Sequence, residues 1–415
     1  MNKKLFWIYL LSGAIYYTQG IEGVPNLAIF FFMKEYLHLN VSTIMYLSLI
    51  TSIAWGIKPL YGFLVDTYFT TKKWILFSLL GSLGICLYLG LSSLLLLPIL
   101  IGLMSMMSLT TAVRDVANDG LMCVEGKKTN SCQKIQTIQW TSLTIAGIFV
   151  ALMGGYIADH FNYKIAYLSL IPIYLIIIGI VLKYRTTAPK NSTLEPKCGN
   201  CKHYENCDLC DYGVCTYYKE NKPTLWESIL SYKELFTNKQ FLLGAAFLFV
   251  YNFAPGFGTP LLFIQRDTFH WSGTFMGMVS ALSSGLGIIG AILYFKYSKY
   301  INIKKCLFWS VFLIGITNLC YLYFTPVSAI IYSCIFSVLG MFIFLNMMSF
   351  MAKSTLSGKE ATSFALLCSC NNLSGTFSTL VGAWLFPLIG LKCIIIIASC
   401  TAFLSLPILK RLEIK

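Results

Sequence analysis

The chain has 415 residues, of which 57% are hydrophobic and only 12% are charged, and its mean hydropathy is +0.70. Soluble globular domains carry about 25% charged residues, so this composition excludes an ordinary soluble enzyme. The formal net charge of +14 would suggest a nucleic-acid partner for a soluble protein. Here the basic residues lie almost entirely in loops between apolar runs, so we expect no nucleic-acid partner.

The apolar residues come in runs of roughly 20, which is the length of helix that crosses a bilayer. The runs are continuous and not alternating, which excludes a β-barrel. We therefore predict an all-α membrane protein with twelve transmembrane helices. In chain order the predicted helices begin near Leu5, Ile44, Trp74, Leu94, Ile135, Ile165, Phe241, Gly273, Cys306, Val327, Ala361 and Leu391.

The basic residues also predict the orientation of the chain. With the N-terminus in the cytoplasm, 25 of the 31 Lys and Arg residues lie on the cytoplasmic side. Only four lie in the opposite loops, namely Lys34, Lys164, Arg266 and Lys392. This asymmetry satisfies the positive-inside rule. We expect both termini to be cytoplasmic and the protein to be a multi-pass monomer in the cell membrane.

The sequence repeats itself at an offset of 228 to 232 residues. The recurring positions are Lys34, Glu35 and His38 with Arg266, Asp267 and His270; Lys72 and Lys73 with Lys304 and Lys305; and Gly147 and Gly154 with Gly375 and Gly382. The repeat predicts two six-helix halves, residues 1–183 and 240–415, joined by a cytoplasmic loop over residues 184–239. Two such halves describe the major facilitator fold, whose central cavity opens alternately to either side of the membrane.

The hairpin after the second predicted helix contains Asp66 followed by Lys72 and Lys73. Glycine, acid and base at this spacing resemble the facilitator loop motif that clasps the cytoplasmic ends of neighbouring helices. We predict that these three residues form a gating contact. Simple solvation of a helix end is the alternative for either lysine. Ser298 replaces the acid in the second half, so the equivalent clasp there is expected to be weaker.

Five ionisable residues fall within or at the edges of predicted spans: Glu22, Lys58, Arg114, Asp115 and Asp119. Such residues are costly in a bilayer and usually face a cavity and pair with one another. Asp115 and Asp119 are four residues apart and share one face of a helix, with Asn118 beside them. We expect these residues to line a cavity, and buried structural ion pairs are the alternative.

Glu22 lies between two glycines and shortly before Pro25, so we expect the first helix to break there. Glu22 and Asp119 are our candidates for carboxylates that exchange a proton during transport, whereas Arg114 and Asp115 are expected to form a static pair. Asn371 and Asn372 are candidates for substrate binding, with an interhelical hydrogen bond as the alternative. The complete predicted binding and coupling set is Glu22, Lys58, Arg114, Asp115, Asn118, Asp119, Asn371 and Asn372.

Several segments resemble the folate-biopterin transporter family. They are residues 20–28, Lys34 with Glu35, residues 55–66 with the run Lys58-Pro59-Leu60-Tyr61-Gly62, the paired acids Asp115 and Asp119, and residues 360–375. The resemblance implies the facilitator fold and transport of folates, reduced pterins or related compounds, with proton coupling in several members. Arg114 departs from the family pattern, which leaves the substrate open.

A planar anionic substrate would be bound by a cation together with aromatic faces. Lys58 and Arg114 could supply the cation, and the aromatic side chains near them in the predicted spans could supply the faces. Those aromatic residues are Tyr16, Tyr17, Trp55 and Trp140. Packing within the bundle is the alternative for each aromatic residue.

The central loop contains two Cys-x-x-Cys pairs, Cys198 with Cys201 and Cys207 with Cys210. A reducing compartment disfavours disulfides, and four thiolates at this spacing can bind one tetrahedral zinc ion. We predict a structural zinc site, with an unliganded loop or an iron-sulfur cluster as alternatives. Transport itself is expected to need no cofactor.

Together these features predict a secondary active transporter that moves folates, pterins or a related small organic solute by alternating access, with protons as the expected symported ion. One alternative is a carrier of another metabolite such as S-adenosylmethionine. Another is a membrane receptor or metal sensor that signals through the cysteine-rich loop. We expect no enzymatic activity, because the sequence has neither a phosphate-binding glycine loop nor a His-Glu-x-x-His motif.

Overall fold

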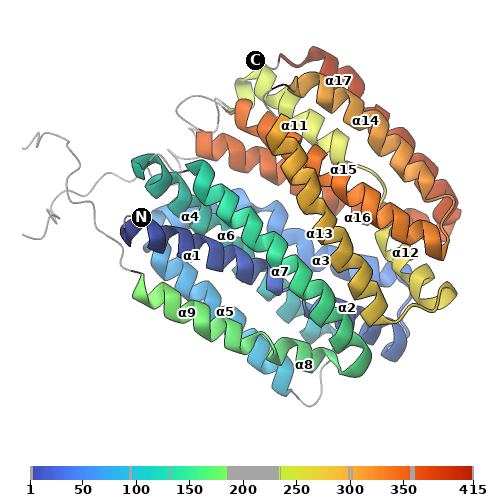
Figure 1. Ribbon diagram of the computed structural model, residues 1–415, viewed down its shortest axis with the longest axis horizontal. Coiled ribbons are helices and arrows are strands. Elements are labelled where there is room, and N and C mark those ends of the chain that lie inside the picture. Colours follow the sequence, from blue (N-terminus) through green and yellow to red (C-terminus); the bar gives the residue numbers. More distant parts are fainter. Residues whose placement is uncertain are drawn as a thin grey trace, which may run out of the picture.

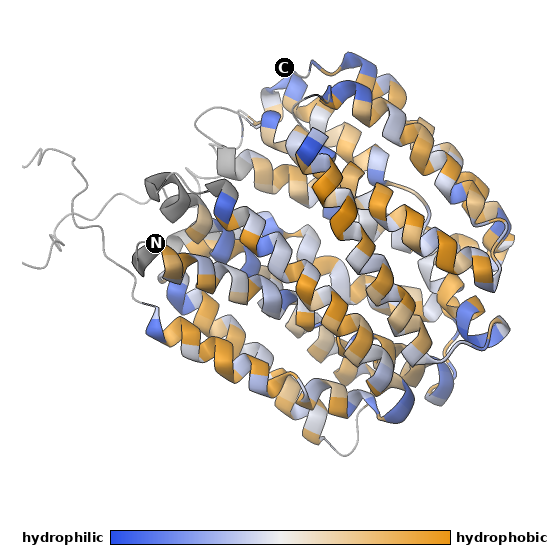
Figure 2. Cartoon of the chain, viewed as in Figure 1, coloured by the Kyte–Doolittle hydropathy of each residue, from blue (hydrophilic) through white to orange (hydrophobic). Residues whose placement is uncertain are grey.

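The computed structural model describes residues 3–92, 96–129, 132–184, 233, 235–297, 300, 302–355 and 360–413, and within these ranges the regular elements are all helical. The helices form one elongated bundle (Figure 1). Apolar residues cover the sides of the bundle, and hydrophilic residues gather mainly at its ends (Figure 2). This distribution fits a bundle whose sides face lipid.

The first half of the chain begins with a broken helix and continues with longer ones. Its elements are α1 (Lys3–Ile21), α2 (Pro25–Phe31), η1 (Phe32–Tyr36), α3 (Val41–Gly56), α4 (Lys58–Thr67), α5 (Thr71–Leu91), α6 (Leu97–Thr129), α7 (Cys132–His160), α8 (Tyr163–Leu168) and α9 (Ile171–Lys183). The break between α1 and α2 contains Glu22, as the flanking glycines and Pro25 predict. Pro25 is the first residue of α2, where its missing N–H costs no hydrogen bond.

The second half repeats this order. Its elements are α11 (Lys239–Asn252), α12 (Gly258–Phe263), η3 (Ile264–Thr268), α13 (Gly273–Tyr297), α14 (Ile303–Cys320), α15 (Pro326–Lys353), α16 (Glu360–Phe403) and α17 (Leu406–Arg411). Eight apolar stretches of the described chain are long enough to cross a membrane. One of them, residues 363–411, turns at Gly390, whose φ is 72°. That stretch therefore accommodates two predicted spans.

The remaining three predicted spans are the interrupted pairs α1 with α2, α3 with α4, and α11 with α12. The whole arrangement is consistent with twelve crossings. Residues 185–232 and 234, which join the halves, fall outside the described residues. The predicted zinc ligands Cys198, Cys201, Cys207 and Cys210 lie there, so that site stays a prediction.

The repeat is visible in side-chain contacts as well as in the order of helices. The Nζ atom of Lys72, at the start of α5, donates to the carbonyl oxygens of Leu182 (3.1 Å) and Tyr184 (2.5 Å), at the end of α9. Lys304, at the start of α14, donates in the same way to the carbonyl oxygens of Lys410 (3.1 Å) and Leu412 (2.5 Å). The same lysine contact therefore recurs at the equivalent place in each half.

The halves meet along two helix pairs, α7 with α13 and α3 with α16. In the first pair the backbones touch at glycines: a Cβ atom on Gly277 would lie 2.1 Å from the carbonyl oxygen of Ala151, and one on Gly155 would lie 2.5 Å from that of Gly273. Small residues permit such close approach between helices in a membrane. The site described next lies where α4, α6 and α7 of the first half face α15 and α16 of the second.

Candidate functional site

The predicted binding residues do not form one site. They separate into two clusters on different faces of α6. The buried cluster, which consists of Glu22, Arg114 and Tyr174 with the hydroxyls around them, lies inside the first half. The interface cluster, which consists of Lys58, Asp115 and Asp119, faces the second half.

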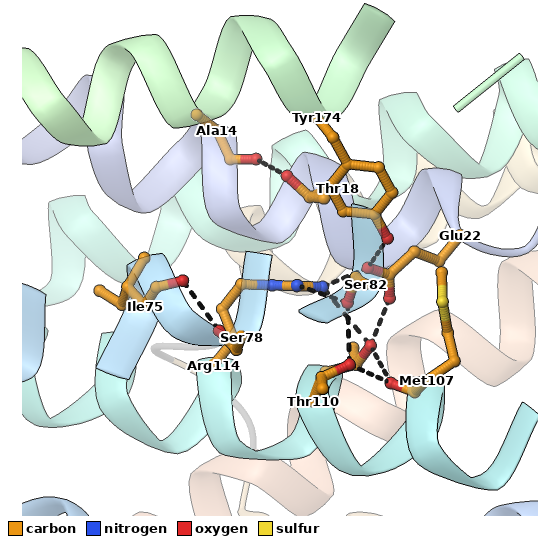
Figure 3. Close-up of polar contacts among 11 residues, drawn as sticks. Ala14, Thr18, Glu22, Ile75, Ser78, Ser82, Met107, Thr110, Arg114 and Tyr174 are labelled. Atoms are coloured by element: carbon orange, nitrogen blue, oxygen red, sulfur yellow. Dashed lines mark hydrogen bonds and ion pairs between the residues drawn. The ribbon is translucent and has the colours of Figure 1, made fainter. Parts of the chain in front are cut away.

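The buried cluster is built around the carboxylate of Glu22 (Figure 3). The Nη2 atom of Arg114 forms an ion pair with Glu22 Oε1, and the hydroxyl of Tyr174 donates to the same oxygen. Thr111 Oγ1 donates to Glu22 Oε2 at 2.5 Å. Arg114 Nη1 also lies 3.4 Å from Ser82 Oγ. The turn between α1 and α2 is thereby tied to α5, α6 and α9.

This cluster is shielded from any solute. The side chain of Arg114 is 1% exposed and that of Glu22 is 8% exposed, while Tyr174 is completely buried. A buried charge is stable only when it is paired and hydrogen bonded, and this pair satisfies both requirements within one half. The geometry therefore supports the structural ion-pair alternative for Glu22 and Arg114.

The expected static pair between Arg114 and Asp115 is wrong. Neighbouring residues on a helix point about 100° apart, so the two side chains leave α6 in different directions. Arg114 turns inward to Glu22, and Asp115 turns toward Lys58. The sequence showed a basic residue beside an acidic residue but did not show which helix faces each of them.

The interface cluster starts with an ion pair between α4 and α6. Lys58 Nζ lies 2.5 Å from Asp115 Oδ2, and the Lys58 side chain is 16% exposed. The same ammonium group lies 4.4 Å from the centre of the Trp55 ring, a cation–π contact. Asp119 lies one helical turn beyond Asp115, and its Oδ1 accepts a hydrogen bond from the Tyr16 hydroxyl at 2.9 Å. Among the described residues no cation forms an ion pair with Asp119.

Residues of the second half complete this region. Cys368 of α16 is close enough to Lys58, Asp115 and Asp119 for electrostatic interaction. Trp140 of α7 packs edge-to-face on Phe344 of α15, with ring centres 5.0 Å apart. We call this pair the aromatic contact. The interface cluster is therefore placed between the two halves.

The three asparagines of the predicted set have different surroundings. Asn372 Nδ2 donates to the carbonyl oxygen of Trp55 at 3.2 Å, so it makes an interhelical hydrogen bond from α16 to α3. Asn118 is fully buried and accepts from Ser12 Oγ at 3.3 Å, while its Nδ2 atom has no partner. Asn371 is half-buried on α16, and its predicted role in binding stays a prediction.

The predicted gating residues lie at helix ends. Lys72 clasps the end of α9 as described above, a contact within the first half. Lys73 is exposed, and Asp66 belongs to α4 although its side chain lies outside the described part of the structure. A gating role for these three residues stays a prediction.

Two ion pairs join the halves at the end of the bundle formed by η1 and η3. Lys34 pairs with Asp267, and Arg266 Nε lies 2.6 Å from Glu35 Oε1. The base of each half thus pairs with the acid of the other, in a reciprocal arrangement that follows the repeat. We call these contacts the outer ion pairs. The sequence repeat contained all four residues, but not their pairing.

Asp159 strengthens the same end of the bundle. Its carboxylate oxygens accept hydrogen bonds from the backbone N–H groups of Gly273 and Thr274, each at 2.6 Å. These groups form the N-terminus of α13, which favours a negative charge. Arg266 Nη1 lies 3.9 Å from Asp159 Oδ1. The first half therefore caps a helix of the second half at this end of the bundle.

Sequence reasoning missed Tyr174, Thr111, Phe344 and Cys368. Tyr174 lies in an apolar run and carries no sequence signal. Cys368 did carry a sequence signal, because it lies 228 residues after Trp140. The repeat therefore places these two residues at equivalent positions of α7 and α16.

Comparison with known proteins agrees with this fold. The sequence model of the BT1 family matches residues 19–413. The chain belongs to the BT1 family. It is 24% identical to the folate-biopterin transporter of Synechocystis sp., over 97% of this chain and 81% of that protein. It is 22% identical to the probable folate-biopterin transporter 4 of Arabidopsis thaliana, over 93% of this chain and 89% of that protein.

The fold of this BT1-family chain is that of the major facilitator transporters. It resembles the crystal structure of a D-xylose–proton symporter with a TM-score of 0.72, over 99% of both chains and at 10% identity. The family prediction made from the sequence is confirmed, as is the fold class. The chain is a multi-pass membrane transporter and not an enzyme.

Proposed function

We propose that this protein is a secondary active transporter that carries folates, pterins or a related small organic anion by alternating access, with protons as the coupling ion. The observation that carries the proposal is the position of the interface cluster, in which a cation and two carboxylates lie between the halves. The names of the curated relatives support folates and pterins as the substrate class.

Lys58 is our candidate for the group that binds the substrate anion. Its ammonium group is partly exposed and already pairs with a carboxylate, that of Asp115. An ammonium group has three N–H donors, so a substrate carboxylate can bind Lys58 beside Asp115 without leaving either buried charge unpaired, which would be costly at this depth. The Trp55 ring under the ammonium group, and Trp140 and Phe344 nearby, offer faces for a flat pterin ring.

Asp119 is our candidate for the proton-exchanging carboxylate. Glu22, the other candidate, is held by an arginine and two hydroxyl groups in the buried cluster. Asp119 accepts from a tyrosine hydroxyl and has no ion-pair partner in the described chain. Its position at the interface lets one carboxylate gain a proton on one side of the membrane and lose it on the other as the halves move.

The test is uptake of tritiated folic acid by proteoliposomes with an imposed pH gradient. Lys58→Met is expected to reduce uptake at least about tenfold, equivalent to about 1.4 kcal/mol, because the anion-binding charge is lost. Lys183→Met, which removes an exposed lysine at the end of α9 in the same half, is the matched control and is expected to transport like the wild type. Equal uptake by the two variants would exclude Lys58 as the anion-binding group.

A carrier of a cationic metabolite such as S-adenosylmethionine is the second candidate. The observation that favours it is Asp119, a carboxylate at the interface without a cation of its own. Competition in the same assay separates the two: excess S-adenosylmethionine would abolish folic acid uptake only if the site accepts a sulfonium group.

We also propose that both termini face the cytoplasm of the cell membrane and that the protein acts as a monomer. The chain ends lie at the end of the bundle opposite to α8 and α12 (Figure 1). In the topology predicted from the sequence, 25 of the 31 basic residues belong to the side of the membrane on which the termini lie. Protection of a C-terminal tag from protease in intact cells tests the orientation.

A further inference from the structure

One tyrosine contacts both the interface cluster and the aromatic side chains that join the halves. The hydroxyl of Tyr16, on α1, donates to Asp119 Oδ1 at 2.9 Å. The ring of Tyr16 packs edge-to-face on Trp140, with centres 6.2 Å apart and an interplanar angle of 65°. Trp140 in turn makes the aromatic contact with Phe344 of the second half. A continuous path of side chains therefore leads from Asp119 to the opposite half.

Residues of four other helices surround the Asp119 carboxylate. Asp115 on α6 is paired with Lys58 of α4, and Cys368 faces the cluster from α16. The amide of Gln139 on α7, a residue that is 1% exposed, also faces Asp119, and Lys58 is close enough for electrostatic interaction with it. The hydroxyl of Tyr16, at 2.9 Å, is the group among these that makes a well-formed hydrogen bond to the carboxylate and also contacts the aromatic side chains between the halves.

We propose that Tyr16 is a positioning residue that couples the charge of Asp119 to the aromatic contact between the halves. The inference rests on the proposed function, because it assumes that Asp119 gains and loses a proton during transport. While Asp119 is charged, the hydroxyl of Tyr16 is held and its ring supports Trp140 against Phe344. When Asp119 is neutral, the ring is released and the aromatic contact loses its support.

The physical basis is the difference between a charged and a neutral acceptor. A hydrogen bond to a carboxylate is roughly twice as strong as one between neutral groups. Tyr16 is therefore held more firmly by charged Asp119 than by protonated Asp119. A single aromatic pair contributes little free energy. A change in the strength of the Tyr16 hydrogen bond can therefore alter the fraction of molecules in which Trp140 packs on Phe344.

The path exists in only one half of the molecule. At the offset of 228 residues, Asp119 corresponds to Met347 and Trp140 corresponds to Cys368. Neither Met nor Cys can reproduce the carboxylate or the ring. A second such path is therefore absent from the equivalent position, and substitution of Tyr16 alone is expected to break the coupling.

Tyr17 provides a matched control on the same helix. Its ring packs edge-to-face on Phe149, with centres 6.4 Å apart, so Tyr17→Phe removes a hydroxyl and retains an aromatic contact just as Tyr16→Phe does. Tyr17 differs in that it is one residue around the helix and does not donate to Asp119. An effect of the hydroxyl on Asp119 will appear in the first variant and not in the second.

The deciding experiment measures the distance between the halves without any substrate. Spin labels are attached to Lys134→Cys on α7 and Ala352→Cys on α15, both exposed, in a chain whose other reactive cysteines are replaced by serine. Distances are measured by pulsed electron paramagnetic resonance at pH 5.5 and pH 8.0 in reconstituted protein. We expect the wild type and Tyr17→Phe to show a shorter main distance at the higher pH.

Tyr16→Phe is expected to give the same distance distribution at both pH values, and so is Asp119→Asn. A pH-dependent shift in Tyr16→Phe equal to that of the wild type would overturn the inference, as would a wild type without any shift. Asp119→Asn keeps the test decisive if Tyr16→Phe does not fold. Uptake of tritiated folic acid is measured separately: its absence in the wild type would refute the proposed substrate, while the distances would still decide the role of Tyr16.

Discussion

The two halves share one fold but differ in what they bury. Equivalent positions in the first and second halves are Glu22 and Ala254, Lys58 and Gly290, Arg114 and Phe342, Asp115 and Ile343, and Asp119 and Met347. Every charged residue of the two clusters thus has an uncharged counterpart. The second half satisfies its interior with neutral contacts such as the hydrogen bond from Tyr251 to Ser310 at 2.6 Å.

The comparison separates what the fold requires from what function requires. Among its described residues the second half buries no charged side chain, so six helices of this kind can pack without one. The fold itself therefore does not require the charged residues of the first half. The buried cluster and the interface cluster differ in where they place these charges. Arg114 and Glu22 are enclosed within one half, whereas Lys58, Asp115 and Asp119 face the other half.

The largest effect is expected from opening the buried cluster. Arg114→Met leaves the Glu22 carboxylate buried without its cation, which typically costs about 3–5 kcal/mol. Phe342→Met, at the equivalent position of the second half, leaves no buried charge unpaired and loses the ring contact with Tyr294, a type of contact that contributes about 0.5–1.5 kcal/mol. Unfolding of the purified variants by denaturant in detergent measures the difference. Equal losses of stability in the two variants would show that the halves do not differ in the way described.

An intermediate effect is expected at the outer ion pairs, where the halves are alike. Lys34→Asp places two acids opposite each other and should reduce uptake by up to about fivefold, since partly exposed pairs contribute about 0.2–1 kcal/mol. Adding Asp267→Lys restores a pair with its direction reversed and should recover most of the uptake. Failure of the double variant to exceed the single one in transport would remove any role for the pairing itself.

The smallest effect on transport is expected from the loop between the halves. Cys201→Ser combined with Cys210→Ser should eliminate bound zinc from the purified protein, because two of four thiolate ligands are lost. Uptake should stay within about twofold of the wild type, because the interface cluster does not include this loop. Elemental analysis of the wild type checks the premise, and a wild type without stoichiometric zinc would end the zinc hypothesis.

Much of the fold could be predicted from the sequence because the bilayer restricts the choice. Long apolar runs must be helical there. The glycines and the proline around Glu22 weaken the helix locally, whatever its tertiary contacts are. The repeat at Lys34, Glu35, Arg266 and Asp267 identified two equivalent halves. The repeat could not reveal that the base of each half pairs with the acid of the other half, because this pairing depends on how the two halves pack together.

The pairing within the site was less predictable for a related reason. Arg114 has Asp115 beside it in sequence, but Glu22 comes from a distant helix break and reaches it only in the folded half. Lys58 and Asp119 were recognised because charge inside a span is rare. Phe344 and Cys368 were not, because aromatic and small residues are common in every span, and only the geometry of the interface distinguishes them.

If Asp119 is the proton-exchanging carboxylate, its protonation changes when substrate binds, and calorimetry measures that change directly. Binding of folic acid to the purified protein is measured in buffers that differ in ionisation enthalpy, so that any exchanged proton contributes to the heat. The wild type and the control Met347→Leu should show heats that change with the buffer, and Asp119→Asn should show heats that do not. An Asp119→Asn variant that binds with the same buffer dependence as the wild type would contradict the account.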